Sequence, residues 1–449
     1  MKRGIMVVAA VLAAVLLAGS AYAKGGSETA KPAGKLKVTY WFFPVVKTVP
    51  GMEATVKDFG DLEKYYAAEY MKANPNVEIV PELQAYEGGV DKINVAVAGG
   101  NPPEIVFDYL GRTSGWYSQG AAVPLDNLIS DGLKADIMDN FKSLYTIGGK
   151  LHGVPGFAWN NGLDVNRGLL KSWGYAGDVL NGPGNAYSLA QFEEFLAKVK
   201  KVAPNGCYPY AIGCASEQGD YTWWAFFWGQ GAALFGKDGA TVAELPGMVE
   251  GYAWIKSMMD KGYFAPGIAT VNASDVVNMW NSGKIAVIAG HKGSSNTMKK
   301  AIDDGLLKIE HDVTIVPFPT KDGKSGFCAM GPTGFVVMTK DPAKQKAAAG
   351  FIEFMVQPKY WQATILGSGQ FPALKSVAAL DLYKNDPFNT IQSQMLAKFP
   401  AGDFALTDPN YSRIRIAMSA AGQSVFSGLK SPGDAVAGFL AEVKKIRGK

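Results

Sequence analysis

Aromatic and acidic side chains stand directly after three short apolar runs in the first quarter of this chain. The runs span residues 36–40, 77–83 and 105–107, and they lead into Trp41-Phe42-Phe43, Tyr86-Glu87 and Asp108-Tyr109. Rings can stack on the apolar C–H faces of a sugar, and carboxylates can accept hydrogen bonds from the hydroxyls at its rim. These residue types predict a site for a small polyhydroxylated ligand, provided that the chain brings them together.

The apolar runs have the spacing of strands separated by helices. Phe59, Leu62, Tyr66 and Tyr70 recur at intervals of three and four residues, and a second helical stretch runs through residues 93–98. A strand–helix–strand–helix–strand order predicts an α/β fold with a parallel sheet, in which the ligand crevice lies beyond the carboxyl ends of the strands. The rings and carboxylates follow those ends.

Helix start signals recur later in the chain. Ser188 and Gln191 have the spacing of a capping box, and Asp341-Pro342 and Ser431-Pro432 have the order of an N-cap followed by a first-turn proline. The aromatic run at 221–228 lacks alternation, which predicts one helix buried over much of its surface.

The N-terminus has the pattern of an export signal. Lys2 and Arg3 precede an apolar run from about residue 5 to residue 17, and Ala21-Tyr22-Ala23 suits a signal peptidase. Because the run is shorter than the ~20 residues of a bilayer span, residues 1–23 are predicted to be a cleavable signal peptide, with a retained anchor as the alternative. Residues 24–34 predict a flexible linker. The mature protein is expected in the periplasm or its extracytoplasmic equivalent.

Size and charge narrow the class of protein. The chain has 449 residues and a formal net charge of +4, which falls to +2 without Lys2 and Arg3. The basic residues are neither in excess nor gathered in runs, so nothing favours nucleic acid as a partner. About 425 mature residues exceed what one core usually supports, which predicts two lobes.

The three cysteines, Cys207, Cys214 and Cys328, leave one thiol unpaired in any arrangement. A local disulfide between Cys207 and Cys214 and two small buried side chains are both compatible with the sequence. No His or acidic residue stands near them at ligand spacing, so no metal site is expected.

Four stretches, taken in order, resemble the extracellular solute-binding proteins of ABC importers, in the sugar-binding group that includes maltose-binding protein (solute-binding family 1). They are YYAAEYMKANPNVEIVP at 65–81, GGNPPEIVFDYLGRTSGWYSQGAAVPL at 99–125, GKLHGVPGFAWNNGLDVNRGL at 149–169 and MWNSGKIAVIAGH at 279–291. The likeness covers nearly the whole mature chain. Two departures are an insertion-like stretch at 44–58 and His291-Lys292, where many sugar binders place a Trp.

The resemblance implies a type II periplasmic binding protein fold. Such a fold has two lobes, each a mostly parallel sheet flanked by helices, joined by several hinge crossings that fall near 157–159, 286–288 and 330–334 of this chain. Lobe 1 would comprise residues 35–157 and 287–331, and lobe 2 would comprise residues 158–286 and 332–449.

The resemblance also carries ligand-binding positions over to this chain. Trp41 joins them as a ring candidate because it directly follows the first strand. The full set is Trp41, Glu87, Asp108, Arg112, Trp159, Asn160, Asp220, Trp223, Trp224, His291, Met330, Gly331 and Tyr411.

The expected function is capture of a mono- or oligosaccharide by closure of the lobes and its delivery to an ABC transporter permease, by a monomer with no catalysis, metal or cofactor. A sugar phosphate, glycerol phosphate ester or polyol is an alternative ligand, because Arg112, Lys292 and Arg413 could hold an anionic group. A secreted carbohydrate-cleaving enzyme is a second alternative, because paired carboxylates near rings also describe glycosidases. Against it, the sequence has no Gly-x-Ser-x-Gly or His-Glu-x-x-His signature and only three His.

Overall fold

The computed structural model describes residues 34–180, 185–236, 239–399, 401–402 and 405–448. The predicted signal peptide and residues 24–33 of the predicted linker lie outside these ranges. Within them, no helix is both long enough and apolar enough to cross a membrane.

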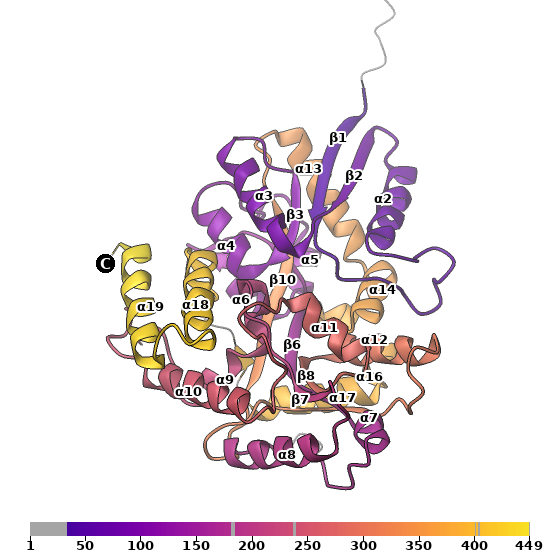
Figure 1. The fold of residues 1–449 in the computed structure, drawn as a ribbon. Helices are drawn as coiled ribbons and strands as arrows, with labels where there is room; N and C mark the ends of the chain where they lie inside the picture. Colours follow the sequence, from indigo (N-terminus) through magenta and orange to yellow (C-terminus); the bar gives the residue numbers. More distant parts are fainter. Residues whose placement is uncertain (1–33, 181–184, 237–238, 400, 403–404, 449) are drawn as a thin grey trace, which may run out of the picture. The chain divides into compact units, whose positions relative to one another are not determined.

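The first three strands form a parallel sheet, as predicted from their alternation with helices. β1 (Leu36–Phe42) lies between β2 (Val77–Leu83) and β3 (Ile105–Tyr109) and pairs in parallel with both. Every residue of β3 is buried, which places this strand inside the fold. Helices α2 (Asp61–Ala73), α3 (Tyr86–Ala98) and α4 (Leu110–Ser118) follow the three strands in turn (Figure 1).

Two long strands carry this sheet into a second region. β6 (Val154–Asn166) and β10 (Cys328–Val337) are antiparallel to each other, and β10 also pairs with β3. The far end of β6 pairs with β8 (Ile285–Gly290) and β9 (Val313–Val316). The strand order is β2-β1-β3-β10-β6-β8-β7, with β7 spanning Tyr208–Tyr210; β11 (Phe371–Pro372) pairs with β6 and β12 (Ala401–Gly402) pairs with β10.

The remaining elements flank or connect these strands. They are α5 (Asp131–Asp136), α6 (Asp139–Leu144), β4 (Thr146–Ile147), β5 (Lys150–Leu151), α7 (Arg167–Ser172), α8 (Leu189–Val202), η1 (Glu217–Thr222), α9 (Ala225–Trp228), α10 (Pro246–Asp260), α11 (Ala273–Asn281), α12 (Lys292–Asp303), α13 (Pro342–Met355), α14 (Pro358–Ser368), α15 (Lys375–Ala378), α16 (Asp381–Lys384), α17 (Pro387–Lys398), α18 (Tyr411–Phe426) and α19 (Pro432–Arg447).

Local helix signals predicted several of these boundaries. The capping box of Ser188 and the N-caps of Asp341 and Ser431 are confirmed. The single helix predicted at 221–228 is wrong, because η1 ends at Thr222 and α9 begins at Ala225. The break lies at Trp223, whose φ of −141° is not helical.

The described residues pack into two large apolar cores. The first core gathers β1, β3, α2, α13 and α14, and the second gathers η1, α8–α10, α18 and α19. β6 supplies Phe157 to the first core and Leu163 to the second, and β10 supplies Phe335 and Ala329 in the same way. We refer to the parts around these cores as the first half and the second half.

Strand pairing corrects the expected division into lobes. Residues 287–331 were expected with the first half, but β8 and β9 pair with the end of β6 that belongs to the second core. Conversely, α13 and α14 pack in the first core, together with Leu374 and Val377. β8 is therefore not a crossing: the chain crosses in β6, in β10 and again between Val377 and α17, whose Phe388 packs against Ile315 of β9.

Candidate ligand-binding site

The first half contributes a buried ion pair at the carboxyl end of β3. Asp108 ends that strand and Arg112 lies four residues on, in the first turn of α4, so both side chains lie on one side of the helix start. Arg112 donates from Nε and Nη2 to the two carboxylate oxygens of Asp108 at 2.6 and 2.5 Å. Both side chains are buried. A two-point charge-assisted pair of this kind fixes the direction of the guanidinium plane.

The second half contributes a matching pair. Asp220 lies in η1 and Arg415 in α18, and Arg415 donates from Nε and Nη2 to the Asp220 carboxylate at 2.6 Å each. Nη2 also donates to the carbonyl of Glu217 at 2.6 Å. Burial raises the pKa of Asp220, and the charge and hydrogen bonds of Arg415 oppose that rise. The two guanidinium groups, one from each half, interact electrostatically with each other.

Aromatic rings lie between the two ion pairs. The ring of Tyr109 is 5.4 Å from that of Trp159 on β6 and 5.4 Å from that of Tyr411 on α18. The Arg112 guanidinium lies 6.0 Å from the Tyr109 ring, and that of Arg415 lies 5.3 Å from the Tyr411 ring. Charged groups and stacking surfaces from both halves thus meet at one place.

Two glycines leave room for these rings. A side chain at Gly331 on β10 would overlap the ring of Tyr109, and one at Gly111 on α4 would overlap the ring of Tyr411. The backbone of each glycine therefore touches an aromatic face that any other residue would displace.

Asn160 is a second kind of candidate, because its side chain has no partner. The residue is 1% exposed, and neither its amide nitrogen nor its amide oxygen has a hydrogen-bond partner. Its backbone carbonyl accepts a bond of 2.6 Å from the amide of Gln392 on α17. Leaving both ends of a buried amide unpaired is costly, so a bound ligand or water is the expected partner.

His291 connects the two halves at the edge of β6. It is the N-cap of α12, and its Nδ1 accepts from the backbone N–H of Gly293 at 2.8 Å. Burial lowers the pKa of His291 to about 4, so the ring is neutral and carries its proton on Nε2. The Gln370 side-chain amide lies 3.2 Å from Nε2 and therefore presents its oxygen to that proton.

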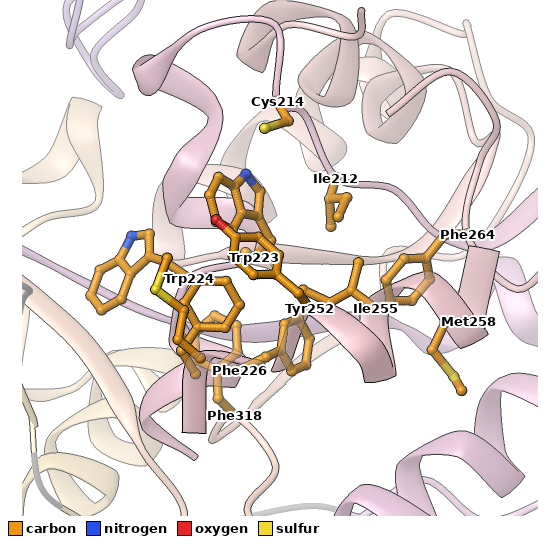
Figure 2. Close-up of a cluster of buried hydrophobic side chains, with 14 of the residues drawn as sticks. Ile212, Cys214, Trp223, Trp224, Phe226, Tyr252, Ile255, Met258, Phe264 and Phe318 are labelled. Carbon is orange, nitrogen blue, oxygen red and sulfur yellow. The ribbon is translucent and has the colours of Figure 1, made fainter. Parts of the chain in front are cut away.

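Two predicted site residues lie in the second core instead. Trp223 is completely buried, donates its indole N–H to the carbonyl of Gly213 at 2.9 Å and packs beside Tyr252 (Figure 2). Trp224 is 2% exposed and packs against Trp228 and Phe327. Trp223 was expected to face the ligand, but in the structure it packs in the core. Its ring has no free face, and its indole nitrogen already donates a hydrogen bond.

Trp41, Glu87 and Met330 are three other predicted candidates. Trp41 carries Lys92 over its ring at 4.3 Å, and Glu87 is exposed within a break of the helical conformation of α3. Met330 packs against the small cluster around Phe141 and Ala158.

Arg415 and Tyr221 were not predicted, and Tyr86 and Tyr109 were singled out only as rings that follow strands. Tyr86 stacks on Phe43 at 5.7 Å and donates its hydroxyl to the Pro44 carbonyl at 3.0 Å. It interacts electrostatically with Arg112 in its own half and with Tyr221 in the other. One feature of the sequence could have pointed to Arg415. It stands four residues after the predicted site residue Tyr411, and therefore on the same side of a helix.

The cysteine alternatives are resolved, since Cys207, Cys214 and Cys328 are all free thiols. The Cys214 Sγ lies 3.5 Å from the carbonyl of Ser419, and that of Cys207 lies 3.9 Å from the carbonyl of Gly283. In the described part of the chain, no three His, Cys, Asp or Glu side chains gather as they would around a metal ion.

Comparison with known proteins shows which family the chain matches. The family described as "Bacterial extracellular solute-binding protein" matches residues 53–360. A putative binding protein of Brucella abortus (strain 2308) is 25% identical over 381 residues, which cover 84% of this chain and 86% of the relative.

Solved structures show the same fold. A solute-binding protein of Thermotoga lettingae bound with α-D-tagatose is 18% identical, with a TM-score of 0.76 over 92% of this chain and 100% of that one. Maltose-bound MalE3 of T. maritima is 15% identical, with a TM-score of 0.75 over 92% and 100%. UgpB of Mycobacterium tuberculosis in complex with glycerophosphocholine is 19% identical, with a TM-score of 0.72 over 92% and 99%. The chain has the two-lobe α/β fold of these proteins.

Proposed function

This chain belongs to the family of bacterial extracellular solute-binding proteins, and from that premise we propose that it captures a carbohydrate between its lobes and delivers it to an ABC transporter permease. The observation that carries the proposal is the meeting of the Asp108–Arg112 and Asp220–Arg415 pairs, one from each half, around the rings of Tyr109, Trp159 and Tyr411. A sugar offers apolar faces to such rings and hydroxyls to such charges.

The ion pairs favour a neutral ligand over a phosphate ester. Each guanidinium already donates from two nitrogens to its own carboxylate. A phosphate would need the same pair of N–H groups for a bidentate contact. Each carboxylate also adds a negative charge that would repel an anion. A sugar phosphate, glycerol phosphate ester or polyol remains the alternative ligand, because UgpB, which has the same fold, is in complex with glycerophosphocholine.

The same pairs favour binding over catalysis. A glycosidase needs one carboxyl group that gives up a proton and a second that attacks or activates water. Asp108 and Asp220 are each bound at both oxygens by an arginine. They are suited to accept hydrogen bonds from hydroxyls and poorly suited to transfer protons.

Closure of the lobes is the proposed mechanism. The first lobe comprises residues 36–157 and 332–383, and the second comprises residues 158–331 and 387–448, as the two cores indicate. Contacts that a ligand makes with both lobes stabilise the closed form relative to the open one. Export by the predicted signal peptide, action as a monomer and recognition of the closed form by the permease complete the proposal.

A calorimetric screen tests the proposal. The mature protein is titrated with a panel of neutral mono- and oligosaccharides, polyols, sugar phosphates and glycerol phosphate esters, and each mixture is analysed for hydrolysis. One-to-one binding of a neutral sugar without turnover supports sugar capture. Binding of phosphate esters alone, or hydrolysis without stable binding, contradicts it.

A further inference from the structure

Two contacts between the halves lie on either side of Trp159. One contact joins α12 of the second half to the end of α14 in the first half. The other joins α18 of the second half to α4 of the first. The position of these contacts bears on the size of the ligand.

The α12–α14 contact is made by backbone as well as side chains. A Cβ atom at Gly293 would lie 2.6 Å from the carbonyl oxygen of Ser368, and one at Gly369 would lie 2.5 Å from the backbone nitrogen of Gly293. The bond between His291 and Gln370 lies beside this approach. Because not even a methyl group fits between the two segments, nothing the size of a sugar ring can pass between them.

Strand register places this contact next to Trp159. Phe371 of β11 pairs with Ala158, so continuing the register by one residue sets Gln370 beside Trp159. Gly290 of β8 pairs with Gly162 on the same edge of β6, and His291 follows it. The α12–α14 contact therefore closes the edge of β6 that faces away from β10.

The α4–α18 contact closes the opposite side. The ring of Tyr411 lies on Gly111, and a Cβ atom at Gly115, one turn further along α4, would lie 3.0 Å from the carbonyl oxygen of Pro409. Like Gly293 and Gly369, these glycines let the two halves approach without intervening side chains.

The two contacts lie at the two ends of a short stretch of sheet below the proposed site. From β3 with Tyr109, through β10 and β6, to Gln370 there are three strand spacings, which amounts to roughly 14 Å. That is the length of two linked pyranose rings. A third ring would have to pass through one of the two contacts.

We infer that the site takes one or two sugar rings and excludes longer chains, with His291 and Gln370 as the residues that limit length. This inference rests on the proposed function. It adds a limit that the family does not set, since structures of the same fold hold ligands as different as tagatose and mannotriose.

The test is a length series measured by calorimetry. Mono-, di-, tri- and tetrasaccharides of several linkage types are titrated into the mature wild-type protein. In any series that binds, the trisaccharide is expected to bind at least about tenfold more weakly than the best shorter member, a difference of about 1.4 kcal/mol. Equal or tighter binding of tri- or tetrasaccharides overturns the length limit and leaves sugar capture intact. Failure of every sugar overturns both.

A matched pair of variants tests the residues named. The double variant His291→Ala/Gln370→Ala removes the side-chain part of the α12–α14 contact. The ratio of the disaccharide affinity to the trisaccharide affinity should fall by at least about threefold, which is about 0.65 kcal/mol. Gln362→Ala replaces a half-buried glutamine on the same α14 whose amide donates to the Lys359 carbonyl; it is the control and should leave the ratio unchanged. An unchanged ratio in the double variant removes the length-limiting role from these two side chains. If the double variant does not fold, the wild-type length series still decides the inference.

Discussion

Replacing Trp223 by alanine should destabilise the protein, and replacing Trp159 should weaken ligand binding. Trp223 is fully buried in the second core, where its ring packs 5.5 Å from Phe227 and 6.0 Å from Tyr252. Truncation of a buried Trp leaves a cavity and costs about 3–5 kcal/mol. Loss of the indole N–H would also leave the Gly213 carbonyl without its partner, which adds to the cost.

Urea unfolding followed by far-UV circular dichroism measures the first effect. We expect Trp223→Ala to lower the midpoint by an amount that corresponds to about 4 kcal/mol, with sugar affinity retained in the fraction that is folded. Trp159→Ala is the matched variant, because Trp159 is only partly buried and lies 5.4 Å from Tyr109. Its midpoint should shift by less than half as much, while the affinity for the best sugar falls by about tenfold. A Trp223→Ala protein that keeps its midpoint and loses affinity would refute the separation of core and site argued above.

Three further outcomes follow from the site and its surroundings. Arg112→Lys should weaken sugar binding by about 1.5–3 kcal/mol, because an ammonium group cannot reproduce the two-point bond to Asp108; calorimetry that gives an unchanged affinity would exclude the pair from the site. Gly331→Ala should displace the ring of Tyr109 and lower affinity by at least about tenfold with the circular dichroism spectrum unchanged, and wild-type affinity would show that the ring does not bear on the ligand. The contribution of His152 to stability should rise with pH between about 4 and 6.5, because burial lowers its pKa to about 4 and the unfolded chain therefore binds a proton there that the folded one does not. This contribution amounts to about 3 kcal/mol and is lost as pH falls through that window, so the difference in unfolding free energy between the wild type and His152→Phe should be larger at pH 7 than at pH 4.5, as urea titrations at the two pH values would reveal.

Local signals in the sequence predicted the local parts of the fold. The strands of the first sheet and the N-caps of α8, α13 and α19 depend on alternation and on residues within one turn, so they could be read without knowledge of the rest of the chain. Asp108 was predicted as a site candidate because it directly follows a strand, whereas Arg112, which pairs with it, was predicted from the resemblance to the family.

Long-range pairing accounts for what could not be predicted. The apolar run that became β8 is compatible with either half, and only its register on Gly162 and Val165 of β6 assigns it to the second. Trp159 lies in the middle of β6 and Trp223 lies between η1 and α9, and both are the same residue type. Which one packs in a core depends on helices such as α10, whose Tyr252 lies far away in sequence.

β6 is one unbroken strand of 13 residues that lends side chains to both cores. If either lobe unfolded and released this strand, part of the core of the other lobe would be exposed to water. Heating should therefore melt the whole body in one cooperative step, and a protease acting on the native chain should find no intact lobe to liberate as a fragment. A mutation that loosens either core will shorten the lifetime of the folded protein as a whole.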